Sequence, residues 1–225
     1  RFSPRMRRGR AVRKLTWQTE LEYNTDPISN ALEDRAVSGK FGIEFNSSDE
    51  VSVTATRQYE RLPFDFTISR GVVVPAGPYS YDLFEASYAL APSRMISGNA
   101  TASYGAFYDG TRATATYSGR VGFSPHFALE PNLTFNWVRL PYGDFDARVV
   151  GTRVVLSPSP RLSFSSLTQF NPAAHSLTSS VRMRWEYHPG SDLYVVYSDG
   201  RDTAAASFPL ANRSFAIKAT RLFRF

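Results

Sequence analysis

Hydrophobic and polar side chains alternate at every second position along most of the chain. In residues 15–23 (LTWQTELEY), Leu15, Trp17 and Leu21 fall on one side of an extended backbone, and Gln18 falls on the other. This period of two is typical of a β-strand with one apolar and one polar face, and helical periodicity is nearly absent. The pattern therefore predicts an all-β protein.

We expect about twelve strands of roughly 8–13 residues in an antiparallel up-and-down order. The predicted strands span 13–23, 35–46, 50–61, 79–90, 95–108, 112–123, 127–139, 145–157, 161–170, 177–187, 192–199 and 213–225. The segment at 145–157 contains DARVVGTRVVL, which can be phased either way. Its two faces therefore stay unassigned.

The connections between these strands differ in length. NSSDE, APSR, SPH, PSP and HPGS are short and rich in turn residues, whereas most others, such as NTDPISNALED and DGRDTAAASFPLAN, are longer. Alternate connections of a meander emerge at opposite ends, so one end carries tight turns and the other carries loops. That asymmetry is typical of outer-membrane barrels, which have short periplasmic turns and long extracellular loops.

Strand length and polarity favour a membrane barrel over a soluble β-sandwich or β-solenoid. About 9–11 tilted residues span a bilayer, whereas soluble strands average about 5–6. Nearly every strand has a densely polar face, and closure around a wet lumen with an apolar exterior satisfies both faces and removes the sheet edges. We predict an antiparallel up-and-down transmembrane β-barrel, closed by this segment or part of a larger barrel.

Aromatic side chains gather near the ends of the predicted strands. Those at the tight-turn end form an expected periplasmic girdle of Phe123, Phe127, Trp185 and Tyr187, and those at the loop end are Tyr23, Tyr59, Tyr108 and Trp137. Strand propensity explains why aromatics are abundant, but not why they lie at both ends. Two belts match the aromatic girdles at the two membrane interfaces.

Composition changes this picture mainly at the N-terminus. The first 14 residues hold seven Arg or Lys and no acidic residue, although the whole chain has a net charge of +6. We therefore divide the chain into a basic arm or linker at 1–12 and a barrel domain at 13–225. The rest of the chain is near neutral, which argues against a nucleic-acid partner. The simpler interpretation of the arm is a solvated segment.

The sequence contains neither an apolar run long enough for a transmembrane helix nor the pattern of a signal peptide. We expect a mature product or a piece of a longer protein. With no cysteine and three widely separated histidines, no metal site and no cofactor are expected. No GxSxG elbow or P-loop occurs, so the sequence leans against an enzyme, although a Ser/His/Asp set could still assemble in space.

Charged side chains on the polar faces are the most informative candidates. The expected lumen-facing residues are Glu20, Glu22, Lys40, Glu44, Arg120, Arg182, Arg184, Glu186 and Lys218. Rings of such charges can select permeating solutes. The alternative is that they form cross-strand ion pairs that only stiffen the wall.

The last thirteen residues, RSFAIKATRLFRF, alternate and end on an aromatic residue. Phe215, Ile217, Phe223 and Phe225 form the apolar series, which resembles the C-terminal signal that barrel-assembly machinery reads. Arg221 falls on the same face, where it is tolerated only near an interface that its long side chain can reach. The expected partners are therefore outer-membrane lipid and the assembly machinery.

Several longer stretches resemble one bacterial family. They include YERLPFDFTISRGVVVPAGPYSYD, GAFYDGTR, NWVRLPYGDFD, RWEYHPGSDLYVVYSDGRD and FAIKATRLFRF. They resemble an outer-membrane barrel family of unknown function whose full-length members carry an N-terminal module similar to family-nine carbohydrate-binding domains. The resemblance covers essentially the whole chain, and it implies the C-terminal barrel of a longer Gram-negative protein. It supplies neither a sugar-binding residue nor a catalytic motif.

The leading hypothesis is an outer-membrane barrel that acts as a pore, a transporter or an anchor for such an upstream module. Small solutes or saccharides would then be its partners. The alternatives are an outer-membrane enzyme of the lipase or protease type and a soluble β-rich binding domain.

Overall fold

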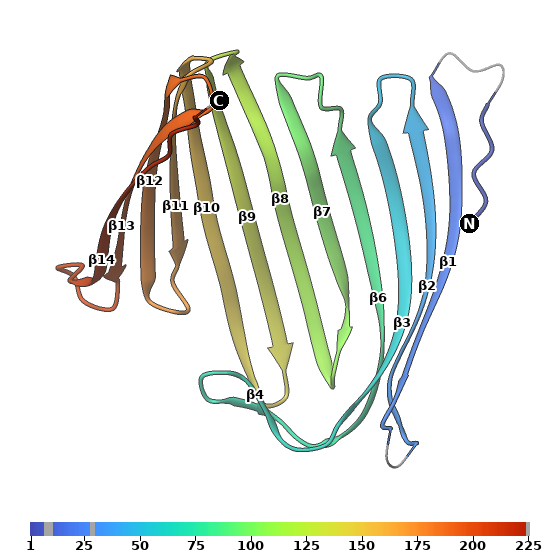
Figure 1. The fold of residues 1–225 in the computed structure, drawn as a ribbon. Coiled ribbons are helices and arrows are strands. Elements are labelled where there is room, and N and C mark those ends of the chain that lie inside the picture. Colours follow the sequence, from blue (N-terminus) through green and yellow to red (C-terminus); the bar gives the residue numbers. More distant parts are fainter. Residues whose placement is uncertain (7–10, 28–29, 224–225) are drawn as a thin grey trace. The chain divides into compact units, whose positions relative to one another are not determined.

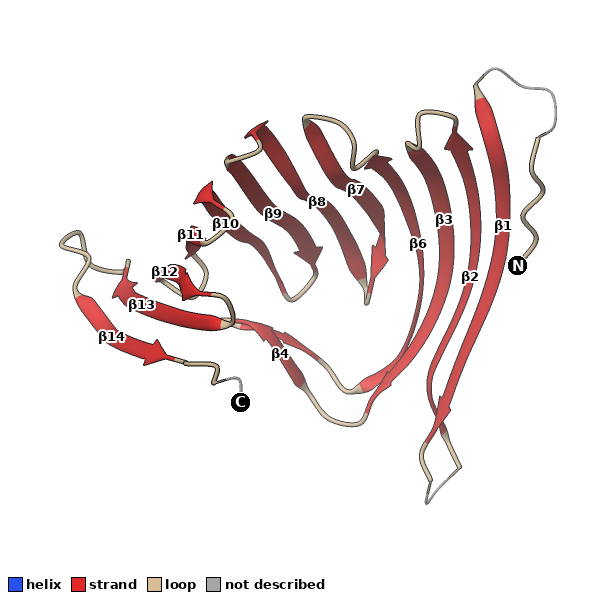
Figure 2. Cartoon of the chain, turned by 45° about the horizontal axis from the view of Figure 1, so that its top comes forward, coloured by secondary structure: helices blue, strands red, loops and turns tan. Residues whose placement is uncertain are grey.

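The computed structural model describes residues 1–6, 11–27 and 30–223, and its regular secondary structure consists of β-strands (Figure 2). Twelve strands form one sheet, and each of them pairs with the next of these twelve along the chain (Figure 1). They are β1 (Val12–Thr25), β2 (Leu32–Phe45), β3 (Glu50–Leu62), β6 (Gly77–Leu90), β7 (Ile96–Phe107), β8 (Gly110–Ser124), β9 (Phe127–Leu140), β10 (Gly143–Ser159), β11 (Leu162–Asn171), β12 (Ser176–His188), β13 (Ser191–Asp202) and β14 (Leu210–Ala219). The described residues include no helix that is long and apolar enough to cross a membrane.

The prediction of an all-β chain with an antiparallel up-and-down order is confirmed. Each expected segment coincides with one strand of the sheet. Most of the strand ends differ from the expected ones by a few residues. The long connection between β3 and β6 differs from a plain loop, because it contains a hairpin of β4 (Phe66–Ser69) and β5 (Val72–Val74).

The last strand is shorter than the prediction of 213–225. β14 ends at Ala219 because its partner β13 begins at Ser191, so little backbone remains to pair with. Thr220 and Asp192 still exchange two backbone hydrogen bonds, of 2.8 and 3.2 Å. Beyond them, the Leu222 N–H donates to the Ser191 hydroxyl at 3.1 Å, so a side chain replaces the backbone partner.

The N-terminal segment lies along the outer edge of β1. Phe2 and Trp17 exchange two backbone hydrogen bonds of 2.8 Å each, and their rings lie 5.8 Å apart. The Leu15 N–H also donates to the Pro4 carbonyl at 3.1 Å. These bonds satisfy part of an edge that would otherwise be open. Within the described residues, no pairing between β1 and β14 closes the sheet.

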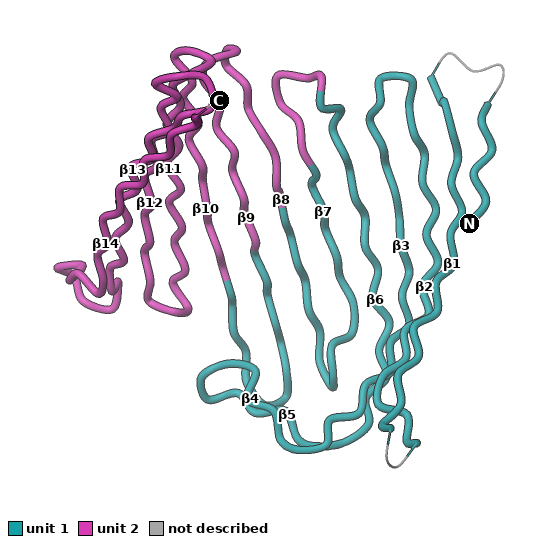
Figure 3. The backbone as a smooth tube through the Cα atoms, in the orientation of Figure 1, with its two compact units in different colours: residues 1–92, 99–116, 135–147 teal, residues 93–98, 117–134, 148–225 magenta. Residues whose placement is uncertain are grey.

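The chain divides into two compact units (Figure 3). Unit 1 comprises residues 1–92, 99–116 and 135–147, and unit 2 comprises 93–98, 117–134 and 148–225. Strands β7 to β10 therefore contribute to both units.

The strand register of unit 1 separates the two faces of its sheet. Trp17 pairs with Phe41, which pairs with Val53, so these side chains share an apolar face. One position along, Gln18 pairs with Lys40 on the polar face. On the apolar face, large side chains such as that of Phe84, 59% exposed, remain largely open.

Unit 2 follows the same rule. Val181 pairs with Tyr197, which pairs with Phe215, and this row is apolar. The neighbouring row pairs Ser180 with Ser198 on the polar face, where their hydroxyls are 2.9 Å apart. Phe215 is 64% exposed, so the apolar face is open here as well.

Candidate functional site

The polar face carries the charged side chains that the sequence singled out. Register and ion pairs place Glu20, Glu22, Lys40 and Glu44 on the polar face of unit 1, and Arg120, Arg182, Arg184, Glu186 and Lys218 on that of unit 2. The structure thus brings each subset together on one face of its own unit. Their exposure to a lumen stays a prediction.

Acidic residues dominate the polar face of unit 1. Glu44 pairs with Arg13 and with Lys14, and Lys40 lies 3.6 Å from Glu50. Further acids on this face are Glu20, Glu22, Asp34, Glu60 and Glu85. Among the described residues, none of these five has an ion-pair partner. This wall therefore has an excess of negative charge.

A hydrophobic cluster covers the loop end of the same polar face. Val72 and Val74 of the hairpin point onto the sheet, and Val74 is fully buried at 0% exposure. The cluster beneath them consists of Tyr79, Tyr81, Phe107, Tyr108, Val138 and Leu140. Val73, between the two buried valines, is 41% exposed. The hairpin thus packs over the polar face instead of extending away from it.

Hydrogen bonds and close packing fix the hairpin in this position. The Tyr79 hydroxyl donates to the Pro75 carbonyl at 2.7 Å, and the Ala76 N–H donates to Asp65 at 2.9 Å. Gly143 has a positive φ of 138°, and a Cβ there would meet a Val72 methyl at 3.0 Å. The glycine therefore allows both the turn and the close approach of Val72.

Two tyrosines in turns are held in their neutral form: Tyr108, which belongs to this cluster, and Tyr142, which packs against it. Burial, and secondly the nearby Glu60 carboxylate, raise the pKa of Tyr108 to about 12. The Tyr142 hydroxyl donates a hydrogen bond to Asp109, and this bond is the main cause that raises the pKa of Tyr142 above its ordinary value. Both tyrosines act as hydroxyl donors and packing groups at neutral pH.

Basic residues surround a hollow on the polar face of unit 2. Glu130 on β9 bridges two arginines, with one carboxylate oxygen 3.0 Å from Arg120 Nη1 and the other 3.9 Å from Arg153 Nη1. A recess of about 280 Å³ opens beside this bridge, and Arg182 on β12 lines its far side. Arg182 makes no ion pair within the described part of the chain.

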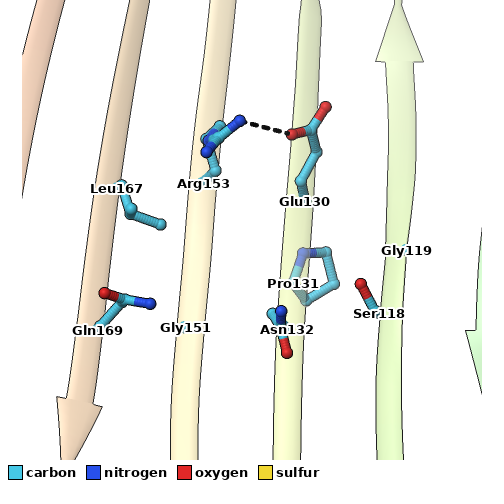
Figure 4. A pocket seen from close by; sticks show the side chains of 9 residues that line it. All are labelled: Ser118, Gly119, Glu130, Pro131, Asn132, Gly151, Arg153, Leu167 and Gln169. Atoms are coloured by element: carbon cyan, nitrogen blue, oxygen red, sulfur yellow. Dashed lines mark ion pairs between the residues drawn. The ribbon is translucent and has the colours of Figure 1, made fainter.

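A second recess of about 260 Å³ adjoins the first one (Figure 4). It shares Glu130, Arg153 and Leu167 with the first recess, and Asn132 and Gln169 add amide groups to its lining. In Figure 4 these side chains come from three neighbouring strands, β9, β10 and β11. Together the two recesses combine cationic groups with neutral hydrogen-bonding groups.

Sequence reasoning missed Arg153 and the role of Glu130. Arg153 lies in the segment whose phase was ambiguous, and its ion pair with Glu130 now assigns it to the polar face. The pairing of Val154 with Ser166 puts Val154 on the opposite face. The alternation in β9 already placed Glu130 on the polar face and Leu129 on the other. Assigning the residues of β10 to their faces would have placed Arg153 beside Glu130.

The expected periplasmic girdle forms two aromatic contacts. The rings of Phe123 and Phe127 stack at 5.4 Å across one tight turn, and those of Trp185 and Tyr187 lie 6.2 Å apart near another. The Tyr187 hydroxyl also donates to the Thr220 carbonyl at 2.9 Å. Both contacts lie at the tight-turn ends of their strands, and a place at a membrane interface stays a prediction.

The expected assembly signal is only partly described. Phe215 and Ile217 are exposed on the apolar face of β14, and Phe223 is exposed beyond the end of that strand. The Arg221 guanidinium lies 5.0 Å from the centroid of the Phe223 ring. Phe225 lies outside the described residues, so its role stays a prediction.

The histidines have local roles where the structure describes them. His126 Nδ1 lies 2.8 Å from the Ser157 carbonyl and links the turn between β8 and β9 to strand β10. In the described ranges, no group of three His, Asp or Glu side chains is arranged to hold a metal ion.

Comparison with models of protein families gave no match to the chain. Comparisons with curated proteins and with solved structures also gave no match. The resemblance to the outer-membrane barrel family therefore stays a prediction.

Proposed function

We propose that this chain is a membrane-spanning β-barrel of a bacterial outer membrane, in which the polar face lines a water-filled passage for small solutes. The observation that carries the proposal is the distribution of apolar surface. Large apolar side chains are exposed in rows on one face of each unit, whereas the buried apolar cluster of the described residues lies on the opposite, polar face. A soluble sheet would bury the first face and expose the second.

The apolar face of unit 1 changes in character toward the loop end of its strands. Rows that begin with Leu15, Trp17 and Thr19 continue across β2, β3 and β6 as mainly apolar residues. The next rows toward the loops contain Arg57, 4.0 Å from Asp82, and then Tyr23. Such a change from aliphatic to charged and aromatic side chains is expected at a membrane interface, where long polar side chains reach water.

In a bilayer the two edges of the sheet must also be paired. In hydrocarbon each unpaired backbone group costs several kcal/mol, so an open sheet edge is not stable in a bilayer. The outer strands β1 and β14 must therefore pair with each other or with further strands of a larger barrel. Residues 2–6, which pair with β1, would separate from this edge in the closed form.

The passage would be polar along its wall and narrowed at its loop end. The hairpin β4–β5 packs over the polar face there and reduces the space that a solute can cross. A barrel that serves only as an anchor would not need charges of one sign to gather on its wall. We therefore favour transport over anchoring.

The outer membrane is the proposed compartment because β-barrels of this kind occur there. The family resemblance and the alternating C-terminal residues support the same compartment. Barrel-assembly machinery and outer-membrane lipid are its proposed partners.

Two measurements on the purified protein test this proposal. Heat-modifiable migration on a gel and a need for detergent are expected of a barrel, and a protein that stays monodisperse without detergent would instead be a soluble binding domain. Planar bilayers should then record discrete conductance steps. Absence of conductance, together with ester hydrolysis that a Ser→Ala change abolishes, would favour the enzyme alternative.

A further inference from the structure

The recess on the polar face of unit 2 has the chemistry of an anion-binding site. Three arginines, Arg120, Arg153 and Arg182, line it together with a single carboxylate, that of Glu130. Glu130 forms ion pairs with Arg120 and Arg153. The side chains of these two arginines are each 51% exposed, and that of Glu130 is 28% exposed. The site therefore keeps an excess of positive charge that solutes can reach.

The Glu130 bridge indicates what kind of group fits. One carboxylate oxygen of Glu130 lies 3.0 Å from Arg120 and the other 3.9 Å from Arg153, so guanidinium groups on this face already bind an oxyanion of the protein itself. Guanidinium groups bind carboxylate and phosphate oxygens through paired N–H donors. Arg182, with no ion-pair partner among the residues that the structure describes, adds a third cation on the opposite side of the recess.

The adjoining recess indicates what the rest of the ligand carries. Asn132 and Gln169 are exposed side chains with amide donors and acceptors, and Gly151 leaves the floor between them open. A Cβ on Gly151 would lie 3.5 Å from Gln169 and 3.6 Å from the Asn132 carbonyl, so any larger side chain would fill this space. Amide groups can both donate hydrogen bonds to hydroxyl groups and accept them. A ligand that places its anionic group at the arginines can therefore place hydroxyl groups at these amides.

We propose that unit 2 binds a small hydroxylated oxyanion, such as a sugar phosphate or sugar acid, with its anionic group between Arg153 and Arg182 and its hydroxyl groups toward Asn132 and Gln169. The inference deepens the proposed function, on which its role in transport rests, by naming the class of solute. Glu130 competes with the ligand for the arginines and so sets the affinity.

The test measures binding of glucose 6-phosphate to the detergent-solubilised protein by titration calorimetry at low ionic strength, with glucose as the uncharged control. The double variant Arg153→Gln/Arg182→Gln is expected to weaken binding of glucose 6-phosphate by about tenfold or more, because it removes two charge-assisted hydrogen-bonding groups. Glu130→Gln is expected to strengthen it, because the competing carboxylate is lost. Glucose is expected to bind far more weakly than its phosphate.

Arg184→Gln is the matched control. Arg184 lies on the same strand and face as Arg182, but it is engaged with Asp192 at 3.0 Å and does not line the recess. This variant should bind glucose 6-phosphate as the unmodified protein does. The proposal is overturned if Arg184→Gln weakens binding as much as the double variant does, if the double variant binds normally, or if glucose binds as tightly as its phosphate.

Heat-modifiable migration checks that each variant is folded, and conductance is measured in parallel. A protein that conducts but binds glucose 6-phosphate equally well in the double variant contradicts the binding site and leaves the barrel standing. A protein that binds through these arginines but never inserts into bilayers contradicts the barrel and leaves the binding site standing.

Discussion

The polar faces of unit 1 and unit 2 are built from the same kind of strand, yet they differ in charge and in cover. On unit 1, acids outnumber bases, and the hairpin β4–β5 buries a hydrophobic cluster over one end. On unit 2, the recess holds three arginines around one glutamate, and no hairpin covers it within the described residues. Period-two alternation therefore fixes which face is polar but leaves the chemistry of that face free.

The two polar faces are also stabilised in different ways. The contacts of unit 1 are buried and specific, as in the cluster below Val74. The ion pairs of unit 2 are partly exposed, as in the Glu130 bridge, and such pairs contribute about 0–1 kcal/mol each. Substitutions should therefore change the structure of unit 1 and the ligand binding of unit 2.

The largest effect is expected from a charge in the buried hairpin. Val74→Asp would bury an unpaired carboxylate, which costs several kcal/mol, so the hairpin should leave the sheet. Trypsin cleavage after Arg70, in the hairpin turn, should become about tenfold faster or more. Val73→Asp is the control, since Val73 is on the exposed side of the same strand. Equal cleavage in the two variants would mean that the hairpin is not held by this cluster.

The second effect concerns a buried carboxylate at the tight-turn end of unit 1. Asp49 is 3% exposed and accepts hydrogen bonds from the Ala91 N–H at 2.9 Å and the Ser47 hydroxyl at 2.8 Å. Asp49→Ala should lower the stability of the fold by about 1–3 kcal/mol, because the Ala91 N–H loses its acceptor. The readout is the temperature at which the heat-modifiable gel band converts. Asp49→Asn keeps one acceptor oxygen. Its conversion temperature should lie between that of the unmodified protein and that of Asp49→Ala.

The third effect is a pH dependence of the same unit. The pKa of Tyr108 is raised to about 12. A tyrosine in the unfolded chain has a pKa of about 10, so the neutral side chain contributes fully below about pH 10. That contribution is lost as the pH rises to about 12. Near-ultraviolet absorbance should therefore record a tyrosinate phase near pH 12 that Tyr108→Phe removes and Tyr104→Phe, on the apolar face, leaves in place. If the absorbance phase near pH 12 remained in Tyr108→Phe, it would come from another tyrosine, and the prediction for Tyr108 would be wrong.

The smallest effect is expected in unit 2. Glu130→Gln should change the stability of the fold by less than about 1 kcal/mol, because both of its ion pairs are partly exposed. The same gel conversion measures it beside Asp49→Ala. A loss as large as that of Asp49→Ala would show that the bridge is structural, and the contrast between the two units would fail.

The sequence predicted the strands because each alternating run needs only local information. It could not phase the strand at 145–157, because Val149, Val150, Val154 and Val155 occupy both faces. A shift of one residue moves every side chain to the other face, so the partner of Glu130 stayed hidden until the neighbouring strands fixed the register.

The hairpin β4–β5 was missed for a different reason. Val72, Val73 and Val74 are consecutive apolar residues, and the burial of Val72 and Val74 depends on residues of β7 and β9 far along the chain as well as on the neighbouring β6. Likewise, β14 ends early because β13 supplies no further partner, a limit that RSFAIKATRLFRF does not contain by itself. Tertiary pairing decides both cases.

The central claim is that the apolar face meets lipid, and all three tryptophans test it. Trp17 and Trp137 lie on the apolar face of unit 1 and Trp185 lies on that of unit 2, each partly exposed. Variants that keep one tryptophan and replace the others with Phe should be reconstituted in bilayers whose acyl chains carry bromine. We predict strong quenching of each tryptophan by the brominated chains and weak quenching by aqueous iodide. Strong quenching by iodide with none by brominated lipid would contradict the account.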